Sequence, residues 1–179
     1  MRSQILHQLD YTGELLQFYT ATDVVFAEAD DSIASTGIGT ATFSVGDYIS
    51  VAGSEVEACN ATWLVKTVVA DKIVIDGVMT ADDAGETITI NQEYIGAWVN
   101  VDEWAKLVGS INCSGDATIY IDQSGDKSNV DYTSSWAVTG GTSLAYSTEV
   151  VQKYARMRIR NNGADQSIMR AYMNGRAIS

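Results

Sequence analysis

Short runs of β-branched and aromatic residues, each ended by a Gly, Asp or Ser turn signal, recur through most of this sequence. In FSVGDYISVAGS a Gly-Asp turn separates two apolar runs, and in TWLVKTVVADKIVID two β-rich runs flank residues 70–72 as in a hairpin. AGETITI follows, with Thr and Ile alternating. The 179 residues include 15 Gly and no Pro. Runs this short and this often interrupted predict an all-β protein.

The spacing of the strands divides the chain into three segments. Residues 31–92 hold four or five short strands, too few for a sandwich, and predict a small β-barrel. Residues 93–179 hold strands separated by polar and Gly-Gly turns, which predict an antiparallel β-sandwich. Residues 1–30 mix apolar side chains with acids and are expected to form a short helix or an extended N-terminal arm. The arm's candidate partner-binding residues are Leu15, Leu16, Phe18 and Tyr19.

The charge of the chain is uneven along its length. The formal net charge is −12, from 11 Lys and Arg against 23 Asp and Glu. Residues 1–149 carry 5 basic and 22 acidic side chains, whereas residues 150–179 carry 6 basic and 1 acidic. An acidic body repels nucleic-acid phosphates and anionic lipid, so we expect neither as a partner. A basic end on an acidic body instead fits contact with acidic protein surface.

The opening segment MRSQILHQLDYTGELLQFY lacks the continuous apolar stretch of a secretion signal, and no apolar run reaches membrane-spanning length. We therefore expect a protein that is made in the cytoplasm and has no membrane partner. Under that condition the two cysteines, Cys59 and Cys113, are expected to be reduced and partly buried thiols.

The stretch KYARMRIR, residues 153–160, is predicted to be a strand with two different faces. Alternation with a period of two places Ala155, Met157 and Ile159 on an apolar face and the arginines on the other. The following NNGAD is a loop of the kind that closes a hairpin, and the return strand adds a further arginine. The candidate partner-binding arginines are Arg156, Arg158, Arg160 and Arg170.

Two interpretations of these arginines stay open. Arginines on one strand face repel one another unless negative groups lie between them. In the first interpretation the side chains pair within the chain, with Asp122, Asp126 or Asp131, and form an ordinary charged face. In the second they face the acidic surface of another subunit, since the planar guanidinium suits paired hydrogen bonds to carboxylates. The two interpretations are compatible in part.

Few residues offer catalytic or cofactor chemistry. His7 is the one histidine, so any Ser-His-Asp or Cys-His arrangement has to use a residue of the predicted arm. The loop DQSGDKSNVD spaces its oxygens somewhat as calcium loops do but has no closing Glu, and a hydrogen-bonded polar turn is the competing interpretation. No Gly-Lys-Ser/Thr phosphate-binding motif occurs. We therefore predict no enzyme, no cofactor and no resident metal.

Two stretches resemble known modules of phage proteins. FSVGDYISVAGSEVEACNATWLVKTVVADKIVID, followed by AGETITI, resembles small β-barrel modules of tailed-bacteriophage virion proteins, although the usual Asn-Gly-aromatic is here residues 60–63, NATW. YIGAWVNVDEWAKLVGSINCSGDATIYIDQSGDKSNVDY, with KYARMRIRNNGADQS, resembles a β-sandwich domain of phage structural proteins. Its motifs are Gly96 to Trp98, Asp122 to Asp126 and Tyr154 to Asn161. From the first quoted residue to the last, the two stretches span residues 43–167, about 70% of the chain.

The resemblance implies a non-enzymatic virion component, assembled in the host cytoplasm. In such a component residues 1–30 would be an arm that orders on a neighbouring subunit, and both β domains would fold without it. Our first expectation is a capsid decoration (cement) protein that binds between capsid subunits, with the major capsid protein or other virion proteins as partners and a homo-oligomeric state. The first alternative is a head-fibre or tail component that contacts host-surface glycans through exposed aromatic residues. The second is a glycan-active enzyme, in which two of the many carboxylates form a catalytic pair.

Overall fold

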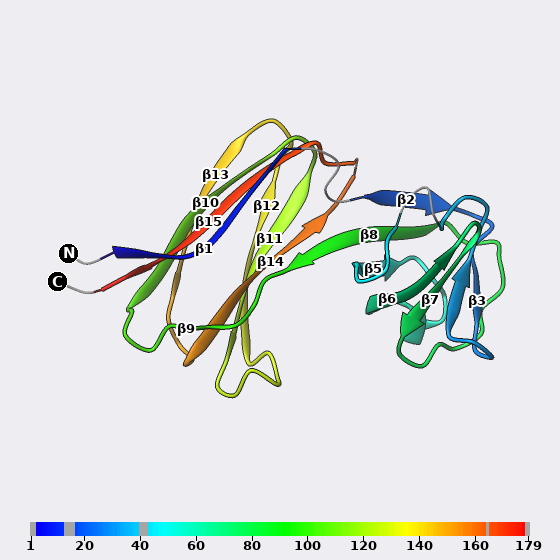
Figure 1. Cartoon of the computed structure of the whole chain (residues 1–179), viewed down its shortest axis with the longest axis horizontal. Coiled ribbons are helices and arrows are strands. Elements are labelled where there is room, and N and C mark those ends of the chain that lie inside the picture. The colour runs from blue at the N-terminus through cyan, green and yellow to red at the C-terminus, as the bar shows by residue number, and fades with distance from the viewer. Residues whose placement is uncertain (1–2, 13–16, 40–42, 164, 178–179) are drawn as a thin grey trace. The chain divides into compact units, whose positions relative to one another are not determined.

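The computed structural model describes residues 3–12, 17–39, 43–163 and 165–177 (Figure 1). The protein is all-β, as the sequence predicts. The strands are β1 Ser3–Thr12, β2 Phe18–Ala21, β3 Val25–Ala27, β4 Ser32–Ala34, β5 Tyr48–Ala52, β6 Thr62–Val69, β7 Lys72–Asp76, β8 Ile88–Ile95, β9 Val99–Asn100, β10 Lys106–Cys113, β11 Ala117–Ser124, β12 Tyr132–Val138, β13 Ser143–Glu149, β14 Tyr154–Asn161 and β15 Ile168–Arg176. One 3-10 turn, η1 Glu57–Cys59, is the helical element of these ranges. Within them, no helix is long and apolar enough to cross a membrane.

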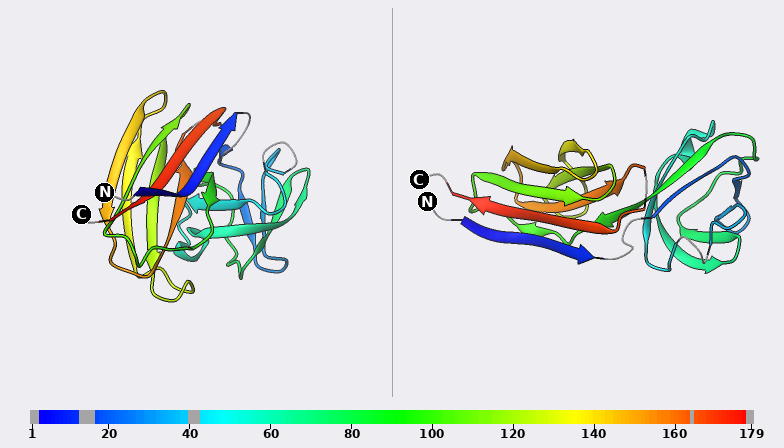
Figure 2. Two further views of the ribbon diagram at one scale, coloured as in Figure 1. Left: turned by 60° about the vertical axis from the view of Figure 1, so that its left-hand side comes forward. Right: turned by 90° about the horizontal axis from the view of Figure 1, so that it is seen from above.

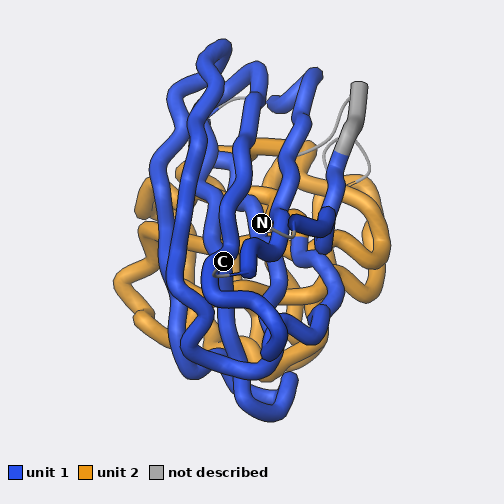
Figure 3. Tube along the Cα trace, turned by 90° about the vertical axis from the view of Figure 1, so that its left-hand side faces the viewer, with its two compact units in different colours: residues 1–15, 95–179 blue, residues 16–94 orange. Residues whose placement is uncertain are grey.

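The chain forms two compact units, shown in blue and orange in Figure 3. Unit 1 combines residues 1–15 with residues 95–179, and unit 2 is residues 16–94. The predicted boundary between residues 92 and 93 lies two residues from the observed one. The predicted start of the first β domain at residue 31 is corrected, because β2 and β3 already belong to unit 2.

Unit 1 is built from two antiparallel sheets that lie face to face (Figure 2). One sheet has the strand order β1-β15-β10-β13. In the other, β11 pairs with β12 on one side and with β14 on the other, and β14 also pairs with β9. This is the sandwich that the strand spacing predicts for the C-terminal part of the chain. The loop NNGAD crosses from one sheet to the other, so the predicted hairpin between the flanking strands is wrong.

The core of unit 1 comes from the alternate residues of each strand. On β14 the buried residues are Ala155, Met157 and Ile159, and on β15 they include Met169, Ala171 and Met173. The strands paired with these two, β10 and β11, supply Leu107, Ile111, Ile119 and Ile121. Because side chains alternate across a strand, burying these residues turns the intervening polar residues of β14 outward. Both cysteines are buried free thiols, Cys113 in this core and Cys59 in that of unit 2.

Unit 2 holds a separate apolar core within one curved strand path. Its order is β8-β5-β6-β7-β4-β3, and β2 pairs with β8. The predicted hairpin around residues 70–71 is confirmed as β6 and β7. Buried residues from Val24 to Ile90 form a single cluster, with contributions from most of these strands. Among the described residues this strand path is an open sheet, and Phe26 at its edge also makes an isolated bridge to Asp82. The expected small barrel is thus observed as an open sheet.

The predicted N-terminal arm is corrected by the strand pairing. β1 runs antiparallel to β15 from Ser3 opposite Arg176 to Thr12 opposite Ile168, and Leu9 is buried in the sandwich core. The physical reason is that an edge strand needs only one buried face, so a sequence with few apolar residues still forms it. The register shifts between Ile5 and His7, which breaks the alternation by which a strand is recognised.

Candidate partner-binding surface

Three of the predicted arginines lie side by side on the outer face of β14. Arg156, Arg158 and Arg160 alternate with buried residues along the strand, and each is half-buried. In register on β11 they lie opposite Asp122, Tyr120 and Thr118 respectively. The outer face of these two strands therefore brings three guanidinium groups against one carboxylate and one aromatic ring.

Asp122 is the buried carboxylate with which two of these arginines pair. Its side chain is 1% exposed, and its carboxylate accepts hydrogen bonds from the Nε of Arg156 at 3.3 Å and the Nε of Arg158 at 3.2 Å. The Thr133 hydroxyl donates to the same carboxylate at 2.9 Å. A buried carboxylate is tolerated only when charge and hydrogen bonds compensate it, and here two guanidinium groups and a hydroxyl do so. The first interpretation, pairing within the chain, is confirmed for Asp122.

Each of the three guanidinium groups also lies over an aromatic ring. The Arg156 guanidinium carbon lies 4.4 Å from the centroid of the Trp98 ring, and that of Arg158 lies 4.0 Å from the Tyr120 ring. The Arg160 guanidinium carbon lies 5.6 Å from the centroid of the same Tyr120 ring. Such cation–π contacts fix the orientation of side chains that otherwise sample many rotamers. We call Trp98, Tyr120, Arg156, Arg158 and Arg160 the arginine face.

Arg160 differs from the other two arginines in its partner. Its Nε donates to the amide oxygen of Asn162 at 3.3 Å, and Asn162 in turn donates to the Thr118 hydroxyl at 2.7 Å. This partner is neutral, whereas Arg156 and Arg158 share the charge of Asp122. With one carboxylate among three guanidinium groups, the arginine face together with Asp122 carries a formal charge of +2.

The loop between β11 and β12 is a hydrogen-bonded turn beside this face. The Asp126 carboxylate accepts the backbone N–H groups of Ser128 at 2.7 Å and Asn129 at 3.1 Å, and these bonds hold the pKa of Asp126 below its usual value. Lys127 lies 4.5 Å over the ring of Tyr154. The described residues contain no cluster of three or more His, Cys, Asp or Glu side chains that could hold a metal ion. The hydrogen bonds to Asp126 are those expected of the polar turn.

The remaining predicted partner-binding residues lie elsewhere. Arg170 is exposed on β15, in the other sheet of the sandwich, so grouping it with the β14 arginines is corrected. Phe18 and Tyr19 are half-buried in β2 of unit 2, where the Tyr19 hydroxyl bonds with the Ser35 hydroxyl at 2.6 Å. Leu15 and Leu16 lie outside the described residues. Sequence reasoning missed Tyr120, although alternation in DATIYIDQS places it between Thr118 and Asp122 on one strand face.

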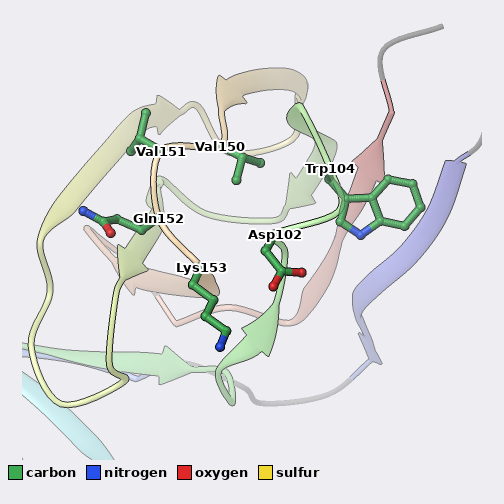
Figure 4. A pocket seen from close by; sticks show the side chains of 6 residues that line it. All are labelled: Asp102, Trp104, Val150, Val151, Gln152 and Lys153. Atoms are coloured by element: carbon green, nitrogen blue, oxygen red, sulfur yellow. The ribbon is translucent and has the colours of Figure 1, made fainter.

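A shallow hollow of about 460 Å³ lies at one end of unit 1 (Figure 4). Asp102 and Trp104 come from the β9–β10 loop, and Val150 to Lys153 come from the β13–β14 loop. The ring of Trp104 packs on Gly175 of β15. His7 lies away from this lining: its Nε2 is 2.8 Å from the carbonyl oxygen of Ala97, and its ring packs against Gly96. The histidine thus has a structural position in the sandwich.

The chain was compared with protein-family models, curated proteins and solved structures. A family model described as "Uncharacterised protein YqxG N-terminal domain" matches residues 79–175, more than half of the chain. This range covers β8 to β15 and so includes the whole arginine face. No curated protein and no solved structure matches this chain.

Proposed function

This chain belongs to the family described as the N-terminal domain of the uncharacterised protein YqxG, and we propose that it is a non-enzymatic structural protein of a bacteriophage particle. Its role is adhesive: the arginine face docks on an acidic surface of a neighbouring virion subunit. As a capsid decoration protein it binds between capsid subunits and stabilises the shell. The resemblance of its two β modules to phage structural proteins supports this class.

The observation that carries the proposal is the composition and rigidity of the arginine face. Trp, Tyr and Arg are the residue types that dominate binding energy at protein interfaces. Here Trp98, Tyr120 and the arginines are already held in place by ring contacts and by Asp122, so little rotamer freedom remains to be lost on docking. The excess positive charge favours an acidic partner.

The glycan-contacting alternative is less well supported by the same geometry. Sugar rings stack on open aromatic faces. One face of the Trp98 ring carries the Arg156 guanidinium, and Tyr120 is in contact with Arg158 and Arg160. Both rings are therefore already in contact with arginine side chains at positions where a sugar ring would stack.

The test is the amount of this protein in purified phage particles, measured by quantitative mass spectrometry. A decoration protein is expected in the hundreds of copies, following the shell symmetry, and a tail component in far fewer. Arg160→Glu is expected to lower the copy number strongly, because it reverses a charge on the docking face without touching Asp122. Arg170→Glu, the same charge change on the other sheet, is the matched control and should leave incorporation unchanged.

Absence of the wild-type protein from particles overturns the proposal, as does full incorporation of Arg160→Glu. Hydrolysis of host polysaccharide by the purified protein would instead favour the glycan-active alternative.

A further inference from the structure

Acidic charge is concentrated in one of the two units. Unit 2, residues 16–94, contains 13 Asp and Glu against 2 Lys. Unit 1 contains 10 acidic and 9 basic residues. Both lysines of unit 2 lie 2.7 Å from carboxylates, Lys66 from Asp76 and Lys72 from Asp30. Neither lysine therefore offsets the rest of the acids in unit 2.

Two loops of unit 2 gather several of these acids. The backbone N–H of Glu55 donates to the Glu86 carboxylate at 3.2 Å, and the Ser54 hydroxyl bonds with the carboxylate of Asp82. Burial raises the pKa of the Cys59 thiol, and the nearby negative charges of Asp82 and Glu86 raise it further. We call Glu55, Glu57, Asp82, Asp83 and Glu86 the acidic loops.

We propose that the arginine face of one copy of this chain docks on the acidic loops of a second copy. The inference rests on the proposed adhesive function and names the partner of that surface. The match is one of charge: the arginine face has three guanidinium groups against one carboxylate, with Lys127 and Lys153 over the adjacent Tyr154 ring. The acidic loops present five carboxylates and no basic residue in their own segments, residues 54–57 and 82–86.

Such a contact joins one surface of the first copy to a different surface of the second copy. Contacts of this kind propagate from copy to copy and close into rings where the geometry allows. Docking also relieves the repulsion among like charges within unit 2, which adds to the attraction between the surfaces. The inference therefore predicts self-association that weakens as salt screens the charges.

The experiment is sedimentation velocity of the full-length protein over a range of concentrations at about 50 and 300 mM salt. The wild type is expected to self-associate at low salt and to weaken about tenfold or more at high salt. Arg160→Glu alone, and Glu57→Lys with Asp83→Lys, are each expected to weaken association about tenfold. A 1:1 mixture of these two variants is expected to restore it, because the reversed charges complement one another across the contact. Arg170→Glu should behave as the wild type.

A wild type that stays monomeric at all concentrations overturns the inference, and so does a mixture that fails to restore association. In either case the copy number of Arg160→Glu in particles still tests the adhesive function separately. Monomeric protein with reduced incorporation of Arg160→Glu assigns the docking surface to a different virion protein. Monomeric protein with unchanged incorporation removes both proposals.

Discussion

The carboxylate of Asp122 lies 3.2 Å from the Nε of Arg158, on a side chain that is only 1% exposed. The arginine is 20% exposed, so the pair lies at the boundary between the sheet and its outer surface. Arg156 makes the same contact from the neighbouring register position at 3.3 Å. Arg156 and Arg158 of this face therefore stabilise the folded state through Asp122 as well as forming part of the proposed docking surface.

Removing both anchoring arginines should destabilise unit 1. Arg156→Gln with Arg158→Gln leaves a buried carboxylate with only the Thr133 hydroxyl, and we expect a loss of about 2–4 kcal/mol in the free energy of unfolding. Adding Asp122→Asn should recover much of this loss, because no buried charge is then uncompensated. Urea unfolding of the wild type, the double arginine variant, Asp122→Asn alone and the triple variant, read as a cycle, measures the coupling. Equal losses with and without Asp122→Asn would show that the ion pairs contribute nothing.

The N-terminal strand is expected to be part of the folded unit. Leu9 is buried against the sandwich core, so Leu9→Ala should lower the free energy of unfolding by about 2–4 kcal/mol. Gln8→Ala changes an exposed neighbour on the same strand and should cost less than about 0.5 kcal/mol. Deletion of residues 1–12 should lower the unfolding midpoint in urea as well, because it exposes the edge of β15. A deletion variant as stable as the full chain would restore the idea of a dispensable arm.

The alternation of apolar and polar residues along the sequence was enough to predict which side chains share a strand face. The alternation in YARMRIRN gave the two faces of β14, and the abundance of acids near residue 122 made Asp122 a candidate partner before its position was known. Both features follow from strand geometry alone, because a period of two fixes which side chains share a face.

The same alternation could not predict which strands pair with one another when they lie far apart in the sequence. Arg170 has the expected outward position on β15, but β15 inserts between β1 and β10 instead of folding back on β14. Nothing in the loop NNGAD distinguishes a hairpin from a crossover between sheets, since both need only a polar turn. The same limit hid β1, whose partner lies more than 150 residues away and whose register shifts at Ile5.

Close packing at Gly175 gives a prediction with a matched control. A methyl group at this position would lie 2.4 Å from the ring of Trp104, so this buried side chain would have to shift to admit it. Gly175→Ala should therefore cost about 1–3 kcal/mol in the free energy of unfolding. At Gly163 the nearest atom to an added methyl group is 3.9 Å away, so Gly163→Ala should change stability by less than about 0.5 kcal/mol. Thermal or urea unfolding that ranks the two variants equally would contradict this packing.

Acid stability of unit 2 should depend on Asp23. Hydrogen bonds from the Ser35 hydroxyl and then from the Thr36 backbone N–H lower the pKa of Asp23 from 3.8 to about 2. Because this pKa is depressed in the folded state, the unfolded state binds more protons in acid. The contribution of Asp23 is therefore fully present above about pH 4 and is lost as the pH falls toward 2.

Carboxyl ¹³C NMR titration of Asp23 measures this shift directly. In Ser35→Ala the largest cause of the depression is removed, so the Asp23 pKa should rise toward 3.8. In Asp23→Asn the unfolding free energy should decline less between pH 4 and 2 than in the wild type, because the group that takes up the proton is gone. A wild-type Asp23 that titrates near 3.8, or an Asp23→Asn variant with an unchanged acid slope, would contradict the assigned hydrogen bonds.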